Sequence, residues 1–208
     1  MRLAHNPNAL ETLRSPSDDA PWRVLVSGCL WGQPCGVDAS DYGMSAHQPP
    51  WLHHRRVEIV PFCPEDFGMG TPRGMPDLHG GDGFDVLDGR AKVLDEHGND
   101  LTQAMLRGAR AMADTALEHK VDFALLTDRS GACGTQVISL GCRFVEPVQY
   151  RRGVGVAAAM LLRCGVAVVS QRDFHTLSVL GSKVDEAFEV DAEALDHHQT
   201  AWVKQNLP

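Results

Sequence analysis

The sequence has no apolar run that approaches the roughly 20 residues of a membrane-spanning helix. Its N-terminal stretch also lacks the apolar central region of a secretory signal peptide. We interpret residues 1–21 as a polar leader with a short helix from about Asn8 to Arg14. We therefore expect a cytoplasmic protein that has no membrane partner.

Positive charge is scarce as well. The chain has 19 Lys and Arg residues against 27 Asp and Glu residues, and its formal net charge at pH 7 is −8. This balance disfavours binding to a nucleic acid polymer, because such binding depends on a basic surface. The 208 residues are 43% hydrophobic, which is enough for one buried core, so we expect a single domain.

The cysteines lack the Cys-x-x-Cys spacing that is typical of structural zinc sites. Disulfides are not expected in a reducing cytosol, so the thiols are better interpreted as metal ligands, catalytic groups or structural residues. We expect Cys142 and Cys164 to be structural, with Cys164 buried as a small apolar side chain. The six cysteines are Cys29, Cys35, Cys63, Cys133, Cys142 and Cys164.

Four short runs rich in Val, Ile and Leu have the composition of strands that are buried on both faces. They are expected to end near residues 27, 62, 127 and 170. Helical patterns separate them, including residues 100–120 and an alanine-rich segment that ends at Gly165. This alternation predicts an α/β fold, a mainly parallel sheet flanked by helices, similar to a Rossmann fold.

Two patterns lie between the second and third strands. In residues 83–100 the apolar residues alternate around Asp88 and Gly89, which predicts an inserted β-hairpin. The helix in residues 100–120 is expected to bury one face. That face is formed by Leu101, Met105, Ala109, Met112 and Leu117.

The chain is expected to have three parts. The polar leader precedes an α/β domain of residues 22–182, and residues 183–208 form a helical C-terminal extension. The extension contains two adjacent histidines, His197 and His198, which we interpret as part of a solvated helix face.

Three of the cysteines directly follow predicted strands: Cys29, Cys63 and Cys133. The carboxyl ends of parallel strands lie at one edge of a sheet, where ligands bind, so these residues can converge although they are far apart in the sequence. Their loops contain Gly, Pro and charged residues, which suits a reactive thiolate or a metal ligand. Spacing alone leaves a zinc site, an iron–sulfur cluster and a single cysteine nucleophile as alternatives.

The residues around these cysteines resemble a known family. Residues 25–40 (LVSGCLWGQPCGVDAS), 60–73 (VPFCPEDFGMGTPR) and 125–134 (LLTDRSGACG) look like the successive signatures of the thiouracil desulfurase-like family, domain of unknown function 523. The resemblance covers roughly residues 22–175. It implies an enzyme that removes sulfur from a thiolated nucleobase with a 4Fe–4S cluster and without electron transfer.

The resemblance also implies how the cluster is held. The positions that match the family's cluster ligands are Cys29, Cys63 and Cys133. These three ligands leave one iron without a protein ligand. A cluster also implies the iron–sulfur assembly machinery as a partner of the protein.

Two further residues are assigned on the same basis, and two others are assigned by their place in the motif loops. Glu65 and Ser130 match positions with catalytic roles, Glu65 as general base or proton shuttle and Ser130 in orienting the substrate or the water. Asp38 and Arg73 lie in the first two motif loops, and we expect them to bind the substrate, with a surface salt bridge as the alternative.

The expected reaction converts C=S to C=O in a small thiolated substrate and releases hydrosulfide. Two other functions remain as alternatives. One is a hydrolase or transferase that uses Cys133 as its nucleophile. The other is a non-enzymatic module that binds a metal or a nucleotide.

Overall fold

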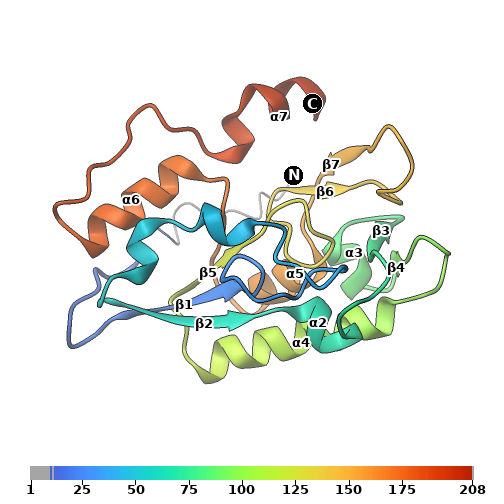
Figure 1. The fold of residues 1–208 in the computed structure, drawn as a ribbon, viewed down its shortest axis with the longest axis horizontal. Helices are drawn as coiled ribbons and strands as arrows, with labels where there is room; N and C mark the ends of the chain where they lie inside the picture. The colour runs from blue at the N-terminus through green and yellow to red at the C-terminus, as the bar shows by residue number, and fades with distance from the viewer. Residues whose placement is uncertain (1–9, 11, 208) are drawn as a thin grey trace.

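A four-stranded parallel sheet forms the centre of the protein, in the order β2-β1-β5-β8 (Figure 1). The computed structural model describes residues 10 and 12–207. The short helix expected from Asn8 to Arg14 therefore lies partly outside the described residues, and Leu13 and Arg14 at its expected end belong to no regular element. The α/β class is confirmed, and the strands end within one residue of the expected positions. They are β1 (Trp22–Ser27), β2 (Val57–Phe62), β5 (Phe123–Leu126) and β8 (Val168–Ser170).

Helices cover both faces of this sheet. On one face, α4 (Thr102–Glu118) and α5 (Val156–Arg163) pack against apolar side chains that include Leu25 of β1. On the other face, α6 (Phe174–Val184) packs against Val24 and its neighbours. Successive side chains of β1 therefore enter opposite halves of the core, as the pleat of a strand requires.

Two antiparallel pairs accompany the parallel sheet. They are β3 (Asp77–His79) with β4 (Lys92–Leu94), and β6 (Val137–Ser139) with β7 (Tyr150–Arg152). An inserted hairpin is thus present, but its expected position in residues 83–100 is wrong. Residues Gly83–Leu87 form helix α3 instead, because the Asp82 side chain caps that helix by accepting two of its first backbone N–H groups.

The two longer predicted helices are present, with two corrections. Helix α4 buries Met105, Ala109 and Met112, but Leu117 is exposed and Ala116 is buried at the end of that face. Helix α5 stops before Gly165, whose φ of +81° suits a residue without a side chain. Cys164 is exposed rather than buried, because it lies at this C-terminal end. Among the described residues, no helix has the length and apolar character that a membrane span requires.

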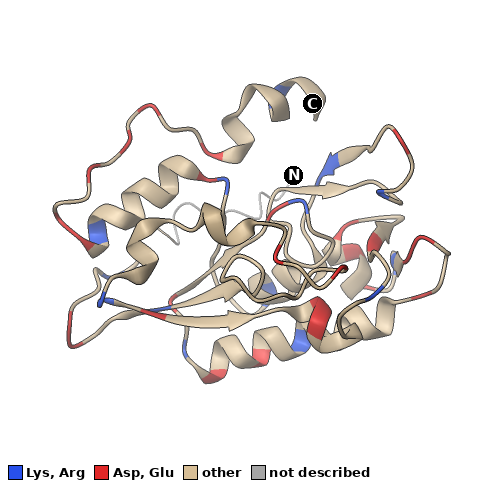
Figure 2. Cartoon of the chain, viewed as in Figure 1, with Lys and Arg blue, Asp and Glu red and all other residues tan. Residues whose placement is uncertain are grey.

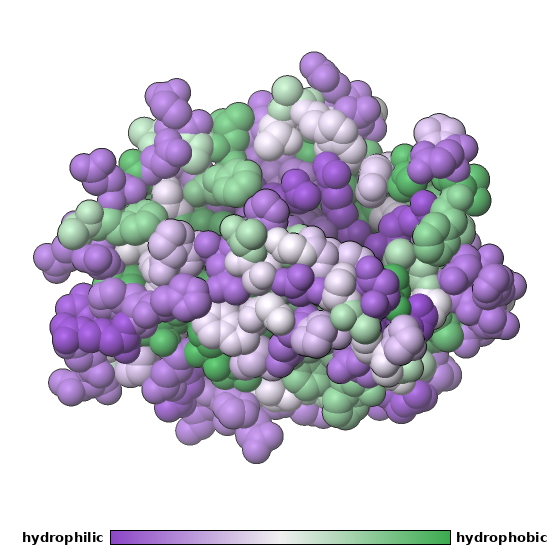
Figure 3. Space-filling view, in the orientation of Figure 1, coloured by the Kyte–Doolittle hydropathy of each residue, from purple (hydrophilic) through white to green (hydrophobic). Residues whose placement is uncertain are grey.

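The C-terminal extension is only partly helical. A 3-10 turn (His197–Gln199) and helix α7 (Ala201–Asn206) follow an acidic segment, residues 185–196, that contains no regular helix (Figure 2). The extension packs beside β6 and β7, where Val203 and Leu207 bury the side chain of Val137. The space-filling view shows hydrophilic side chains in the hollow next to α7 (Figure 3).

Candidate active site

The carboxyl ends of β1, β2 and β5 meet at a cavity of about 320 Å³. Cys29 lies two residues after β1, Cys63 directly follows β2, and Cys133 lies in the loop after β5. All three line the cavity, and Cys35 lines it as well. The structure therefore brings the three strand-end cysteines together and adds a fourth.

Close backbone packing joins the first two cysteine loops. The Gly28 N–H donates to the carbonyl of Phe62 at 2.9 Å, which keeps the turn after β1 beside the end of β2. A Cβ on Gly28 would lie 3.2 Å from the Cys35 sulfur and 3.2 Å from the Cys63 Cβ, so the absence of a side chain permits this approach. The Cys63 sulfur in turn accepts the N–H of Asp66 at the start of α2 (Pro64–Met69).

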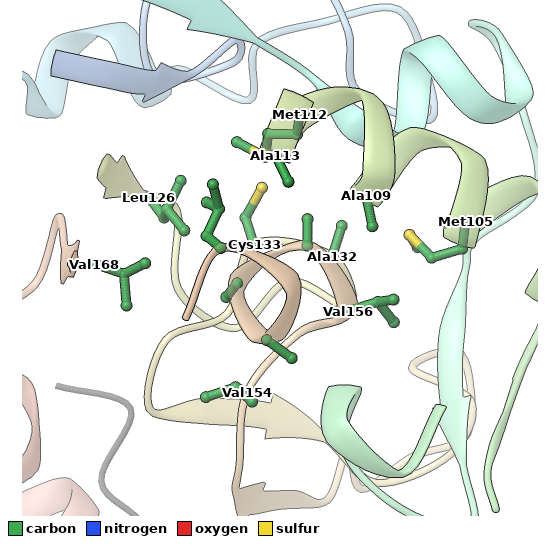
Figure 4. Packing of buried hydrophobic residues seen from close by; sticks show 14 of the residues in the cluster. Met105, Ala109, Met112, Ala113, Leu126, Ala132, Cys133, Val154, Val156 and Val168 are labelled. Atoms are coloured by element: carbon green, nitrogen blue, oxygen red, sulfur yellow. The ribbon is translucent and has the colours of Figure 1, made fainter. Parts of the chain in front are cut away.

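Hydrogen bonds among Cys29, Cys35 and Cys63 shift the pKa values of these three thiols in different directions. The bond with Cys35 lowers the pKa of Cys29 to about 7, although burial opposes this change. It also lowers the pKa of Cys63, whereas the bonds to Cys29 and Cys63 raise the pKa of Cys35. Cys35 is therefore the thiol that keeps its proton, and its single S–H can donate to one neighbouring sulfur at a time. Burial raises the pKa of Cys133, whose sulfur lies among apolar side chains (Figure 4).

The spacing of the sulfur atoms bears on which metal group could be held. Four sulfurs around one zinc ion would lie about 3.8 Å apart, because tetrahedral Zn–S bonds are about 2.3 Å long. Among the described residues, no three of the cysteine sulfurs lie within 4.8 Å of one another. Thiolates are also the ligands of iron–sulfur clusters. The donor set thus fits a cluster of several irons better than a single ion.

A carboxylate and a hydroxyl meet beside the cysteines. Ser130 Oγ donates to Glu65 Oε1 at 3.1 Å, although Glu65 lies in the first turn of α2 and Ser130 lies in the loop after β5. The same hydroxyl oxygen accepts the backbone N–H groups of Ala132 and Cys133 at 3.1 and 3.0 Å. Ser130 is thereby tied to the backbone of the residue that carries the third strand-end thiol.

Arg73 neutralises the charge of Glu65. Its NH2 group donates to Glu65 Oε2 at 2.8 Å, and the two side chains are only 5% and 13% exposed. The guanidinium also donates to the Cys35 and Gly70 carbonyls and to the Thr71 hydroxyl. Arg73 lines the cavity as expected, but its hydrogen bonds are made to the protein and hold Glu65 in place.

Asp38 is not brought to the site. The described residues that line the cavity include Val37 but not Asp38, which is exposed. Its carboxylate accepts the N–H and the hydroxyl of Ser40, and these bonds lower the pKa of Asp38. The side chain thus stabilises its own turn and does not line the cavity.

The sequence interpretation missed a second buried carboxylate. Asp128 lies two residues after β5, lines the cavity and is 4% exposed. Its Oδ2 lies 2.6 Å from Nδ1 of His197. The expectation of a solvated histidine pair is therefore wrong for His197, which is buried. The position of Asp128 just after a buried strand could have indicated its role from the sequence. No local pattern indicates that His197 is its partner.

Comparison with known proteins shows which part of the chain matches a protein family. A model of the 2-thiouracil desulfurase family matches residues 24–173. The chain belongs to this family. This confirms the resemblance found in the three cysteine motifs. The solved structure of TudS, a 4Fe–4S-dependent thiouracil desulfidase, has 31% sequence identity and a TM-score of 0.61, covering 76% of this chain and 96% of that chain.

Two curated proteins are also similar to this member of the 2-thiouracil desulfurase family. The uncharacterized protein YbbK of Bacillus subtilis (strain 168) is 31% identical over 155 residues, which cover 74% of this chain and 99% of that protein. A beta-glucosidase of Rhizobium radiobacter is 29% identical over 136 residues, which cover 57% of this chain but 17% of that protein. The glucosidase match therefore concerns a small part of a much longer protein.

Proposed function

We propose that this protein removes sulfur from a thiolated nucleobase or a similar thiocarbonyl compound, converting C=S to C=O and releasing hydrosulfide. The observation that carries the proposal is the pairing of Glu65 with Ser130 in a cavity lined by four cysteines. The family to which the chain belongs, and the similar TudS structure, are thiouracil desulfurases. A small thiolated molecule is therefore the substrate that we propose.

In this proposal, a 4Fe–4S cluster is held by Cys29, Cys63 and Cys133, and one iron has no protein ligand. The convergence of these thiols from three loops supports the assignment. When bound, such a cluster supplies an iron that accepts the soft sulfur of the substrate and withdraws electrons from the C=S carbon. Cys35 keeps its proton, and its single S–H donates to one ligand sulfur at a time, which helps to orient that sulfur.

Glu65 is the general base in this proposal. Both of its oxygen atoms accept hydrogen bonds, one from Arg73 and one from Ser130. The Ser130 hydroxyl can rotate about its C–O bond and donate to the substrate instead. Glu65 Oε1 is then free to take a proton from the water that attacks the C=S carbon, while Arg73 keeps the carboxylate oriented.

The site does not favour a cysteine nucleophile. Nucleophilic cysteines act as thiolates, which a neighbouring base or cation usually stabilises. Burial raises the pKa of Cys133, and none of the described residues that line the cavity is a histidine. The free Cys133 thiol is thus a poor nucleophile, whereas a metal that binds this sulfur would itself displace its proton.

Anaerobic purification tests the proposal directly. We expect a brown protein that contains iron and acid-labile sulfide and that releases hydrosulfide from 2-thiouracil and 4-thiouracil without an electron donor. Reconstitution with iron and sulfide controls for incomplete loading by the cell's assembly machinery. A colourless protein after reconstitution, or turnover that strictly requires a reductant, would contradict the proposal.

A further inference from the structure

One carboxylate organises the loop that carries Ser130 and Cys133, residues 128–137, here called the cysteine loop. Asp128 Oδ1 accepts four backbone N–H groups at 2.9 to 3.2 Å. The donors are Arg129, Thr135, Gln136 and Val137. Both ends of the loop are therefore tied to the same oxygen atom.

The other oxygen of Asp128 faces the C-terminal extension. His197 Nδ1 donates to Oδ2 at 2.6 Å, and Ser170 Oγ lies 3.4 Å from the same oxygen. The side chains of His197 and Asp128 are 4% and 0% exposed. Burial alone would raise the pKa of Asp128, but the hydrogen bond and the charge of His197 hold this pKa below its usual value. His197 thus stabilises the carboxylate on which the loop depends.

The neighbours of His197 hold it firmly in this position. Its backbone N–H donates to Asp173 Oδ1 at 3.0 Å, and Asp173 also binds the side-chain amide of Gln136 in the cysteine loop. The preceding Asp196 accepts the N–H and the hydroxyl of Thr176 in α6. The extension is therefore anchored on the domain at His197 and at the residue before it.

A second contact holds the residue next to Ser130. Arg129 has a φ of +61°, a backbone conformation that side chains disfavour and that needs support from its surroundings. Its guanidinium lies 4.1 Å from the centre of the Trp202 ring and 5.2 Å from that of Tyr150. The His197 ring lies nearly parallel to the Trp202 ring, 6.4 Å away. The extension therefore braces both ends of the strained segment 128–129.

We propose that the C-terminal extension forms part of the active site, with His197 as a positioning residue that fixes the cysteine loop through Asp128. His197 and Trp202 lie beyond residue 173, where the match to the family model ends. The shared fold therefore supplies the cavity, and the extension supplies the contacts that immobilise one of its walls. The activity readout of this inference rests on the proposed function, whereas its structural readout does not.

The test compares His197→Asn with His197→Leu. An asparagine amide can place an N–H near the position of Nδ1 and still donate to Asp128, whereas leucine fills space without a donor. In the apoprotein, we expect iodoacetamide to alkylate Cys133 faster in His197→Leu than in the wild type or in His197→Asn. Mass spectrometry reports the rate for each cysteine separately, so exposure of Cys133 is distinguished from general unfolding.

The reconstituted protein gives a second and a third readout. We expect His197→Leu to lose iron to a chelator about tenfold faster than the wild type, and to have a kcat for 2-thiouracil lowered about tenfold with little change in KM. His197→Asn should restore most of both values. His175→Leu is the matched control, because His175 bonds to the Asp191 carbonyl and not to the cysteine loop.

Three results would overturn the inference. They are unchanged Cys133 alkylation in His197→Leu, unchanged iron loss in that variant, and a His197→Asn variant as impaired as His197→Leu. A wild-type protein that holds a cluster but releases no hydrosulfide would contradict the proposed function instead. The alkylation and iron-loss comparisons would still decide the role of His197 in that case.

Discussion

Replacing Glu65 by glutamine removes one charge from the site and changes few atoms. The variant leaves Arg73, which is 5% exposed, without the carboxylate that it contacts at 2.8 Å. Breaking a buried ion pair in this way costs about 3–5 kcal/mol. For a chain of this size each kcal/mol lowers the Tm by about 2–4 °C, so we expect Glu65→Gln to melt roughly 6–20 °C below the wild type. Arg73 keeps its hydrogen bonds to the Cys35 and Gly70 carbonyls in the variant, so we expect the drop in Tm to be near the smaller value.

The rate should fall by more than the loss of stability explains. Removing a general base typically slows a reaction by about 10²–10⁴. The assay is hydrosulfide release from 2-thiouracil and 4-thiouracil without oxygen or an electron donor, below the Tm of the variant. The visible absorption of the cluster, measured on the same sample, shows whether the site is assembled.

A second variant separates the two effects. Glu65→Gln combined with Arg73→Met removes both charges, so we expect it to recover much of the lost stability and none of the rate. A double variant that regains both would show that Glu65 acts only through its ion pair. Undiminished turnover in Glu65→Gln alone would place the base elsewhere.

Other expected outcomes concern the ligands, the packing of the cysteine loop and pH. Cys63→Ala should abolish the binding of iron and sulfide in colorimetric assays, whereas Cys142→Ala, outside the cavity, should retain both; a full iron complement in Cys63→Ala would refute the ligand assignment. Gly155→Ala would place a Cβ 2.4 Å from the carbonyl of Ala132, so urea unfolding should show a loss of roughly 1–3 kcal/mol, and wild-type stability would contradict this packing. Burial raises the pKa of Asp173 to about 6, so the folded protein holds this proton more tightly than the unfolded chain and the stability contribution decreases as pH rises. Relative to Asp173→Asn, the free energy of unfolding of the wild type should therefore decrease by on the order of 1 kcal/mol between pH 5 and 8, and parallel curves would refute this assignment.

Local patterns were sufficient for the fold class and for the edge of the sheet where the site lies. The apolar runs are short and bounded by Gly, Pro or charged residues, so their lengths and ends can be read directly from the sequence. Cys29, Cys63 and Cys133 could be expected to converge because parallel strands align their carboxyl ends. Gly165 could be expected to end α5 because a positive φ favours glycine.

Local sequence patterns gave wrong predictions for the secondary structure of residues 83–87 and for one residue of the buried face of α4. Residues 83–87 alternate in polarity like a strand, but a side-chain cap from Asp82 is sufficient to start a short helix there. Leu117 lies about 100° around α4 from Ala116 and so falls outside the face formed by Met105, Ala109 and Met112, whereas Ala116 lies on that face and is buried. The error for Leu117 was therefore one of helical phase, because the spacing of Met105, Ala109 and Met112 continues to Ala116.

The sequence by itself determined the four parallel strands and the convergence of three of the four thiols that line the cavity, because strand periodicity and chain direction are local properties. Only the tertiary structure decided which polar side chains meet. Arg73 and Ser130 converge on Glu65, Asp38 turns away from the cavity, and His197 is buried against a carboxylate at the end of β5. Such pairs depend on the paths of loops and on how the extension packs against the domain. The physical reason is that a hydrogen bond requires atoms to lie about 3 Å apart, and no local pattern specifies a distance between residues that are remote in the chain.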